Sequence, residues 1–176
     1  MLFLRKMKFF AKRAVAQQLN TLKERTAFKP KHVRRLLMIH EIDLDITEAQ
    51  YQEMLHFFSD EYTFVERVNY SPNKKFLEGL AKPHLHAQSL DWRGRMQADD
   101  LRYALEQEYD LVIHFVSQIT LPLNYFSARL NARFRIGTSL IDERLSDLVL
   151  PPKVDFGSFL ADLKNFYIKI KPNETK

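Results

Sequence analysis

Short apolar segments that favour strands alternate along this chain with helical segments of ten to fifteen residues. The clearest strand is Leu111–Val116, which holds one polar residue, His114, among five large apolar ones. An apolar run of this length is typical of a strand buried on both faces of a parallel sheet. Strands and helices in alternation predict β-α-β units, with helices on both faces of the sheet. We therefore expect a single Rossmann-like or flavodoxin-like three-layer α/β domain with a mostly parallel sheet of five or six strands.

The expected elements follow one another from residue 33 onward. Apolar runs and polar–apolar alternation predict strands over residues 33–39, 62–70, 85–90, 111–116, 134–136 and 148–150. Helical periodicity predicts helices over about 47–58, 98–108, 122–131 and 155–170. Thr47 and Gln50 have the spacing of a capping box at the start of the first helix, and Pro122 suits the first turn of the third.

Positive charge is concentrated at the start of the chain. Residues 1–35 hold eleven of the 27 Lys and Arg residues against one acid, Glu24, so the remainder holds 16 basic and 21 acidic residues. An apolar stripe at helical spacing predicts a helix over 2–25, and its members are Phe3, Met7, Phe10 and Ala14. Because Pro30 follows this segment, we divide the chain into a basic amphipathic helix at 1–30 and an α/β domain at 31–176.

This basic helix is the strongest candidate for partner binding. Its charges suit a polyanion such as RNA or a ribosome surface, and its apolar residues suit a protein partner. An anionic membrane surface is a further candidate, and packing of the stripe on the body is the structural alternative. The expected contacts are Phe3, Arg5, Lys6, Lys8, Phe9, Phe10, Lys12 and Arg13. A second candidate is the single tryptophan, Trp92, which stacks a base with the help of Arg93 and Arg95 or else fills the core.

The carboxyl ends of the strands are the expected place for a small ligand, because open parallel sheets bind ligands there. The polar residues expected at this edge are Asp43, Asp45, Asn69, Tyr70, Ser117, Gln118, Thr138 and Ser139. Of these, Asp43, Asp45, Asn69, Ser117 and Thr138 are the candidate ligand-binding residues. The corresponding function is an enzyme, or the relic of one, that handles a sugar or a phosphorylated small molecule. Asp43 and Asp45 are equally suited to forming a turn.

Several kinds of chemistry find no support in the sequence. The four glycines are too far apart for a GxGxxG motif or a Walker loop, and no GxSxG elbow is present, so we expect no cofactor and assign no catalytic residue. His84 and His86 form the one close histidine pair, and no third ligand lies near them, so we expect no metal. His114, inside the best apolar strand, is interpreted as a hydrogen-bonded core residue.

The absence of cysteine excludes disulfides and cysteine catalysis, and it favours a cytoplasmic location. No apolar run approaches the roughly 20 residues that a membrane span needs. The first apolar residues are interrupted at Arg5, which is too early for a secretory signal. The acid-free first 23 residues also resemble an organelle transit peptide, which stays an alternative.

The order of motifs from Trp92 onward carries a resemblance to known proteins. These motifs are Trp92–Gly94, Tyr109–Phe115, Leu121–Tyr125, Ser127–Gly137, Asp142–Arg144 and Asp147–Leu150. The chain resembles, over nearly its whole length, a family of small bacterial proteins known only as a domain of unknown function. Its central motifs are also similar to the acceptor half of heptosyltransferase-like glycosyltransferases, but the roughly 40 residues after Gly137 are too few for the donor half of those enzymes.

Overall fold

The protein is described here by a computed structural model that covers residues 2–23, 28–58, 64–91, 93–153 and 155–170, with side chains from residue 12 onward apart from residue 23. Within these residues the chain forms one sheet of six parallel strands in the order β3-β2-β1-β4-β5-β6. The strands are β1 (Arg35–Glu41), β2 (Phe64–Tyr70), β3 (His84–Leu85), β4 (Glu108–Phe115), β5 (Asn131–Thr138) and β6 (Leu148–Leu150). This sheet confirms the predicted α/β Rossmann-like domain.

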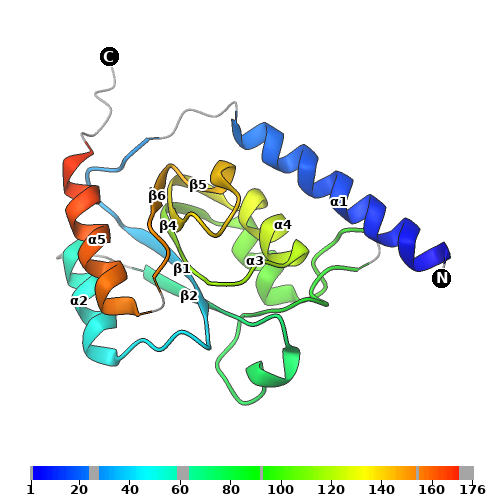
Figure 1. Cartoon of the computed structure of the whole chain (residues 1–176), viewed down its shortest axis with the longest axis horizontal. Coiled ribbons are helices and arrows are strands. Elements are labelled where there is room, and N and C mark those ends of the chain that lie inside the picture. The colour runs from blue at the N-terminus through cyan, green and yellow to red at the C-terminus, as the bar shows by residue number, and fades with distance from the viewer. Residues whose placement is uncertain (1, 24–27, 59–63, 92, 154, 171–176) are drawn as a thin grey trace.

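Helices cover both faces of the sheet (Figure 1). The helices are α1 (Leu2–Lys23), α2 (Glu48–Phe58), α3 (Asp99–Glu106), α4 (Leu121–Arg129) and α5 (Phe156–Lys169), with short 3₁₀ helices η1 (Lys74–Leu77) and η2 (Glu143–Leu145). Helices α2 and α5 pack on one face, α3 and α4 pack on the other, and α1 lies over α4 and η2. Among the described helices, none combines the length and the apolar character that crossing a membrane requires.

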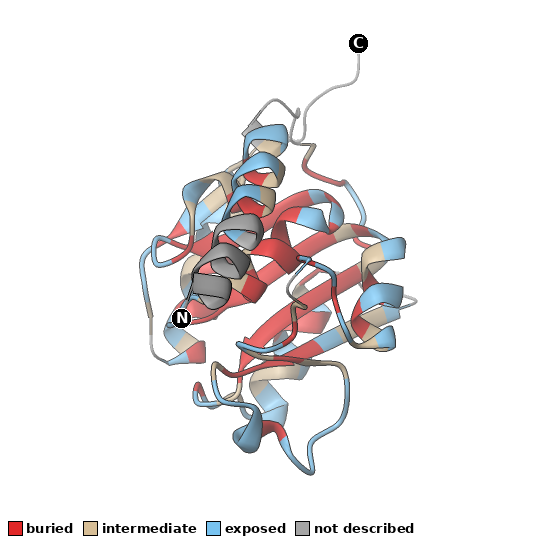
Figure 2. Cartoon of the chain, turned by 90° about the vertical axis from the view of Figure 1, so that its right-hand side faces the viewer, coloured by how far each residue is buried: buried red, intermediate tan, exposed pale blue. Residues whose placement is uncertain are grey.

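The two faces of the sheet bury different side chains of the same strand. In β1, Leu37 and Ile39 join the core beneath α1, α3 and α4, whereas Leu36 and Met38 join the core beneath α2 and α5. This alternation follows from the two-residue period of a strand. Because both faces are covered, the central strands are almost wholly buried (Figure 2), which explains the continuous apolar runs in the sequence.

Local signals in the sequence set the starts of several helices. The capping box is confirmed, because the Thr47 backbone N–H donates to Gln50 Oε1 at 3.0 Å and the Gln50 N–H donates to Thr47 Oγ1 at 3.3 Å. Pro122 lies in the first turn of α4, whose N-cap residue, Thr120, accepts a hydrogen bond from the Leu123 N–H. These contacts satisfy N–H groups that the first turn of a helix leaves without a partner.

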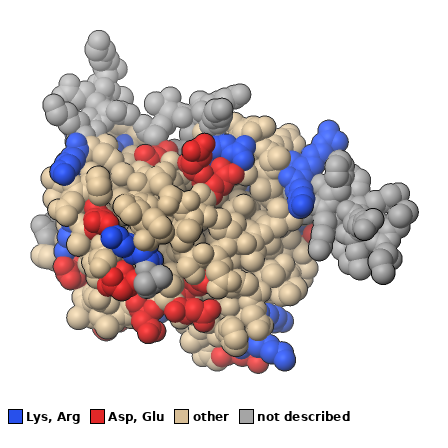
Figure 3. Space-filling view, in the orientation of Figure 1, with Lys and Arg blue, Asp and Glu red and all other residues tan. Residues whose placement is uncertain are grey.

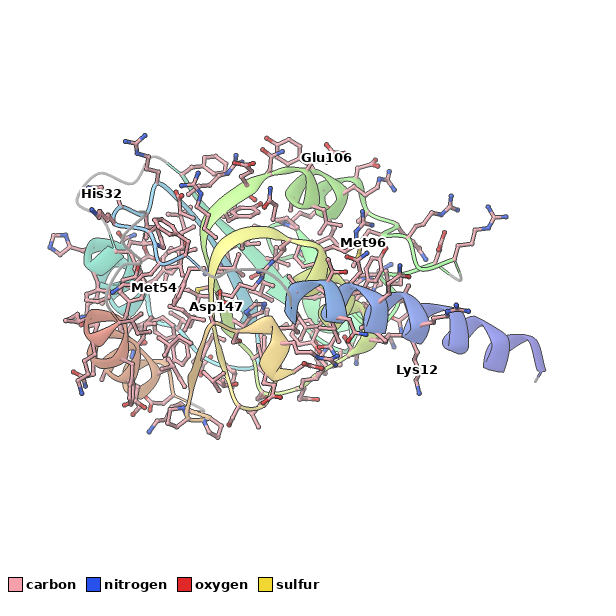
Figure 4. The ribbon with its side chains drawn as sticks, turned by 90° about the horizontal axis from the view of Figure 1, so that it is seen from above. Lys12, His32, Met54, Met96, Glu106 and Asp147 are labelled. Carbon is pink, nitrogen blue, oxygen red and sulfur yellow. The ribbon has the colours of Figure 1, made fainter. Side chains whose placement is uncertain are left out.

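The carboxyl-terminal half of α1 belongs to the core. Val15 and Leu19 are each 4% exposed and lie in the same cluster as the strands, and Asn20 Oδ1 accepts a hydrogen bond of 3.0 Å from Arg144 Nη1. Of the predicted apolar stripe, Ala14 packs against this cluster, and the side chains of Phe3, Met7 and Phe10 lie outside the described residues. Packing of the stripe on the body thus stays a prediction for these three residues. The amino-terminal turns of α1 extend past the body (Figures 1 and 4).

Two cations of the basic segment stabilise the fold. Lys29 is buried, and its Nζ donates to the carbonyl oxygens of Tyr167 and Ile170 at the end of α5. A positive charge at this position also interacts favourably with the helix dipole. Arg35 pairs with Glu66 at 3.0 Å. The charge available to a partner is therefore smaller than the sequence count suggests.

Candidate functional site

The carboxyl ends of β1 and β4 meet at the centre of the sheet. After β1 the chain crosses to β2 on one side, and after β4 it crosses to β5 on the other. In open parallel sheets this divergence forms the crevice in which ligands bind. The first candidate site is therefore the region between the loops that follow Glu41 and Phe115.

Glu41, the last residue of β1, fills this crevice with its own carboxylate. The residue is completely buried. Its Oε2 accepts hydrogen bonds from the Ser117 N–H at 2.5 Å, the Ser117 hydroxyl at 2.9 Å and the Gln118 N–H at 3.0 Å, while Oε1 accepts one from Gln118 Nε2 at 3.0 Å. Successive N–H groups of this kind bind anions in other proteins. Here the chain supplies the anion itself.

Three of the predicted ligand-binding residues lie around this contact. Ser117 is joined directly to Glu41, whereas Asp43 and Asp45 are exposed in the loop after β1. Sequence reasoning missed Glu41. The signal that was available is a carboxylate placed directly after the apolar run of a buried strand, where a charge needs partners.

The other two predicted ligand-binding residues lie farther along the same edge. Asn69 is buried near the end of β2, and its Nδ2 donates to the Ala81 carbonyl oxygen at 2.7 Å. Thr138 is buried at the end of β5, and its Oγ1 has no hydrogen-bond partner within the described chain. The edge thus carries the expected polar residues without gathering them around one open site.

Two buried histidines flank the centre of the sheet. Burial lowers the pKa of His114 to about 4, so the ring is neutral. Its Nδ1 lies 3.3 Å from the Ile136 carbonyl oxygen, which only accepts, so Nδ1 carries the proton and Nε2 accepts from the Ser127 hydroxyl at 3.0 Å. The interpretation of His114 as a hydrogen-bonded core residue is confirmed. Burial also lowers the pKa of His40, whose Nε2 lies 2.6 Å from the Leu44 carbonyl oxygen.

A pocket of about 520 Å³ opens beside β3, and we call it the β3 pocket. Its charged and polar lining includes Lys74, Lys82, His84, His86, Asp99 and Asp100. Burial lowers the pKa of His86, and its Nδ1 accepts a hydrogen bond from the Gln88 N–H at 3.2 Å. The described residues contain no group of three His, Asp or Glu side chains that could hold a metal ion. The lining thus offers charged and polar groups of both signs.

The turn at Asp91–Arg95 is held together by its first residue and lies against α1. The Asp91 carboxylate accepts hydrogen bonds from the N–H groups of Arg93 at 2.8 Å and Arg95 at 2.9 Å. These hydrogen bonds lower the pKa of Asp91, and the bond from the Arg95 backbone N–H has the largest effect. Gly94 has a φ of +76°, and the position of a Cβ there lies 3.8 Å from Ala14 Cβ. Glycine thus permits both the turn and its close approach to α1.

The predicted partner-binding residues fall into two groups. Lys12, Arg13, Arg93 and Arg95 are exposed, and basic side chains lie beside the projecting end of α1 in the space-filling view (Figure 3). Within the described chain, no ion pair joins Lys12 or Arg13 to an acid. Trp92 lies outside the described residues, and so do the side chains of Phe3, Arg5, Lys6, Lys8, Phe9 and Phe10.

Comparison with known proteins identifies a family. A model described as a family of unknown function, DUF6913, matches residues 7–170, so the chain belongs to this family. The match confirms the predicted membership of an uncharacterised family. Searches of curated proteins and of solved structures found no match.

Proposed function

We propose that this member of DUF6913 is a non-enzymatic binding module that docks on a polyanionic partner, and on RNA in particular, through helix α1. The observation that carries the proposal is the division of one helix into two parts. Val15 and Leu19 anchor the second half of the helix in the core. The first half extends past the body, and the exposed Lys12 and Arg13 lie where it meets the anchored half. A rigid anchor behind a cationic end lowers the conformational cost of binding.

The sequence of the projecting half suits a nucleic acid. Five cations, with no acid among them, fall within its first 13 residues, and they are Arg5, Lys6, Lys8, Lys12 and Arg13. Each phosphate contact releases a condensed counterion, so such a cluster favours polyanions. Phe3, Phe9 and Phe10 supply aromatic rings on which bases stack. An RNA partner is also compatible with a cytoplasmic protein that contains no cysteine.

The contact at the centre of the sheet supports a role without catalysis. Ser117 and Gln118 would be the donors for an anionic ligand at this position, and all four of their hydrogen bonds go to Glu41. A ligand would have to displace a buried carboxylate that is fully hydrogen-bonded, and this carries a large penalty. The donors that Ser117 and Gln118 would offer in this crevice are therefore already bound by the protein itself.

A variant of the full chain with the five cations of α1 replaced by Gln tests the proposal. Binding is measured by fluorescence anisotropy with a labelled uridine RNA of about 12 nucleotides. We expect the affinity to fall by more than about tenfold, because the phosphate contacts are lost. The control is R67Q/K75Q, which removes two exposed cations outside α1 and the β3 pocket. Equal binding by the wild type and the five-residue variant would disprove the proposal.

The same two proteins separate RNA from a membrane. Vesicles of phosphatidylcholine with and without phosphatidylserine are sedimented with each protein. Retention of the protein on the anionic vesicles without any RNA binding would identify a membrane, and not RNA, as the partner. The apolar stripe of α1 would then enter the lipid interface. RNA binding without retention on vesicles is the expected result.

The β3 pocket favours a second candidate function, the binding of a sugar phosphate or a related small molecule. Lys74 and Lys82 make no ion pair within the described residues, and the pocket also offers His84 and the carboxylates of α3. Sugar phosphates should then raise the melting temperature of the wild type and not that of K74A/K82A. No shift with any sugar phosphate would remove this candidate.

A further inference from the structure

A second pocket lies at the amino ends of the central strands, on the edge of the sheet opposite to the crevice of Glu41. It has a volume of about 530 Å³, and we call it the amino-edge pocket. The residues of its lining that bear on ligand binding are Phe28, Lys31, His32, Arg34, Asp110 and Arg133. None of the positions predicted as a candidate site belongs to it.

Two acids, Asp110 and Glu108, line this pocket, and both have partners within the protein. Glu108 Oε1 accepts a hydrogen bond of 3.4 Å from Asn131 Nδ2. Asp110 Oδ2 accepts hydrogen bonds from the N–H groups of Arg34 at 2.9 Å and Arg35 at 3.0 Å, and Oδ1 lies 3.6 Å from Arg133 Nη1. By contrast, the exposed side chains of Lys31 and Arg34 make no hydrogen bond or ion pair within the described chain. The rim of the pocket is therefore cationic, with two groups available to an external anion.

The segment that carries these two cations is held in place at both ends. The Phe28 N–H donates to the Arg133 carbonyl oxygen at 3.2 Å, and the next residue, Lys29, is bound to the end of α5. At the other end, Asp110 fixes the backbone of Arg34 and Arg35. The pocket is thus formed before a ligand arrives, which reduces the ordering that binding requires.

We infer that the amino-edge pocket binds a phosphate group of a nucleic-acid strand, with Lys31 and Arg34 as its charged ligands and Phe28 as an apolar wall for the adjoining nucleoside. The inference rests on the proposed function, because it adds a second contact for the strand that α1 binds. Arg is suited to this role, since its guanidinium group donates two parallel hydrogen bonds to a phosphate.

The position of the pocket favours a strand over a lipid surface. Lys12 and His32 lie toward opposite ends of the molecule when it is seen from above (Figure 4). A helix of 22 residues is about 33 Å long, which corresponds to about ten phosphates at the axial spacing of one duplex strand. A flexible strand can follow this path and place one phosphate inside a concave pocket, whereas a flat bilayer cannot enter the pocket.

The test compares the wild type, the Gln variant of α1 and two further variants of the full chain by anisotropy with labelled uridine RNA and thymidine DNA of about 12 nucleotides each. K31A/R34A removes the two pocket cations that have no ion pair within the described chain and keeps the backbone N–H that Asp110 binds, and R67A/K75A, which removes two exposed cations outside α1 and both pockets, is the charge-matched control. We expect K31A/R34A to raise the Kd about tenfold at about 50 mM salt and to lower the salt slope by about 1.4, as two lost phosphate contacts require. The control should change the Kd by less than about twofold.

The outcomes distinguish this inference from the proposed function. If K31A/R34A binds like the control while the Gln variant of α1 is weakened, the pocket is not a contact and the proposed function stands. If the wild type binds neither oligonucleotide, both ideas fail, and retention on anionic vesicles would then identify a membrane as the partner. If K31A/R34A raises the Kd for RNA and DNA equally, the pocket binds the phosphodiester that both strands share. If it raises the Kd for RNA alone, the pocket binds an RNA strand.

Discussion

At the scale of single residues, the centre of the fold depends on Glu41 and on donors that lie 76 residues later in the chain. A buried carboxylate is stable only when its oxygen atoms are hydrogen-bonded, and here both of them are. The contact also fixes the loop that leads to Thr120, the N-cap residue of α4. Glu41 thus links the end of β1 to the loop that starts α4.

Replacement of Glu41 by Gln should lower the free energy of unfolding by about 2–4 kcal/mol, because an amide NH₂ would face donors that need an acceptor. Urea unfolding followed by circular dichroism measures the change. Asp45→Asn is the matched control, since Asp45 is exposed and its replacement should stay within about 0.5 kcal/mol of the wild type. A Glu41→Gln protein as stable as this control would show that the carboxylate is not structural.

The neutral ring of His114 predicts a dependence of stability on pH. Burial lowers its pKa to about 4, whereas an unfolded histidine titrates near about 6.5. The unfolded chain therefore takes up the proton first, so the folded state loses stability as the pH falls from about 6.5 to about 4, by about 3 kcal/mol in total. Above this range His114 contributes no pH dependence.

Urea unfolding of the wild type and of His114→Asn between about pH 7 and pH 4.5 isolates this contribution. The free energy of unfolding of the wild type should fall more steeply, because the variant lacks the titrating ring while other groups titrate in both proteins. Parallel curves for the two proteins would contradict the assignment of a neutral buried His114.

At the scale of elements, α1 is one helix with two environments. Leu19 is 4% exposed within the core, whereas Thr21, two residues later, is exposed. Leu19→Ala should therefore lower the free energy of unfolding by about 2–4 kcal/mol, and Thr21→Ala should change it by less than about 0.5 kcal/mol. Both values come from chemical unfolding of the full chain. A Leu19→Ala variant with the stability of Thr21→Ala would show that α1 is not anchored on the body.

The sequence predicted the elements whose signals are local. The capping box at Thr47, the strand around Ile113 and the last helix follow from spacing and periodicity alone. The full length of β5 was not predictable in this way, because Arg133 and Arg135 break its apolar pattern. Arg135 is buried, and its Nη2 donates to the Leu130 carbonyl oxygen at 2.5 Å, so its charge is accommodated by the tertiary fold.

The candidate sites were predicted only in part, for the same physical reason. The order of strands places Asn69, Ser117 and Thr138 at one edge, as the β-α-β pattern predicts. The sequence pattern does not predict that Glu41 binds the donors of the crevice, because the hydrogen bonds between Glu41 and Ser117 or Gln118 join segments that are far apart in the chain. The amino-edge pocket was missed for the same reason, since it combines the linker after α1 with residues of β4 and β5.

At the scale of the whole molecule, an α/β body in which Glu41 binds the donors of the central crevice carries a cationic helix at one end and a cationic pocket toward the other. Both features belong to the basic first 35 residues, and the remainder of the chain carries a slight excess of acids. This asymmetry would orient the molecule on the proposed polyanion, because the body would be repelled where the helix is attracted.

The dependence of RNA affinity on salt tests this account most directly. The Kd of the full chain for uridine RNA of about 12 nucleotides is measured by anisotropy from about 50 to about 300 mM NaCl. If the five cations of α1 each contact a phosphate, a plot of the logarithm of the association constant against the logarithm of the salt concentration should have a slope of about −3.5. Phosphate contacts in the amino-edge pocket would make this slope steeper. An affinity that does not change with salt, or no binding at the lowest concentration, would contradict the central claim that this helix docks on a polyanion.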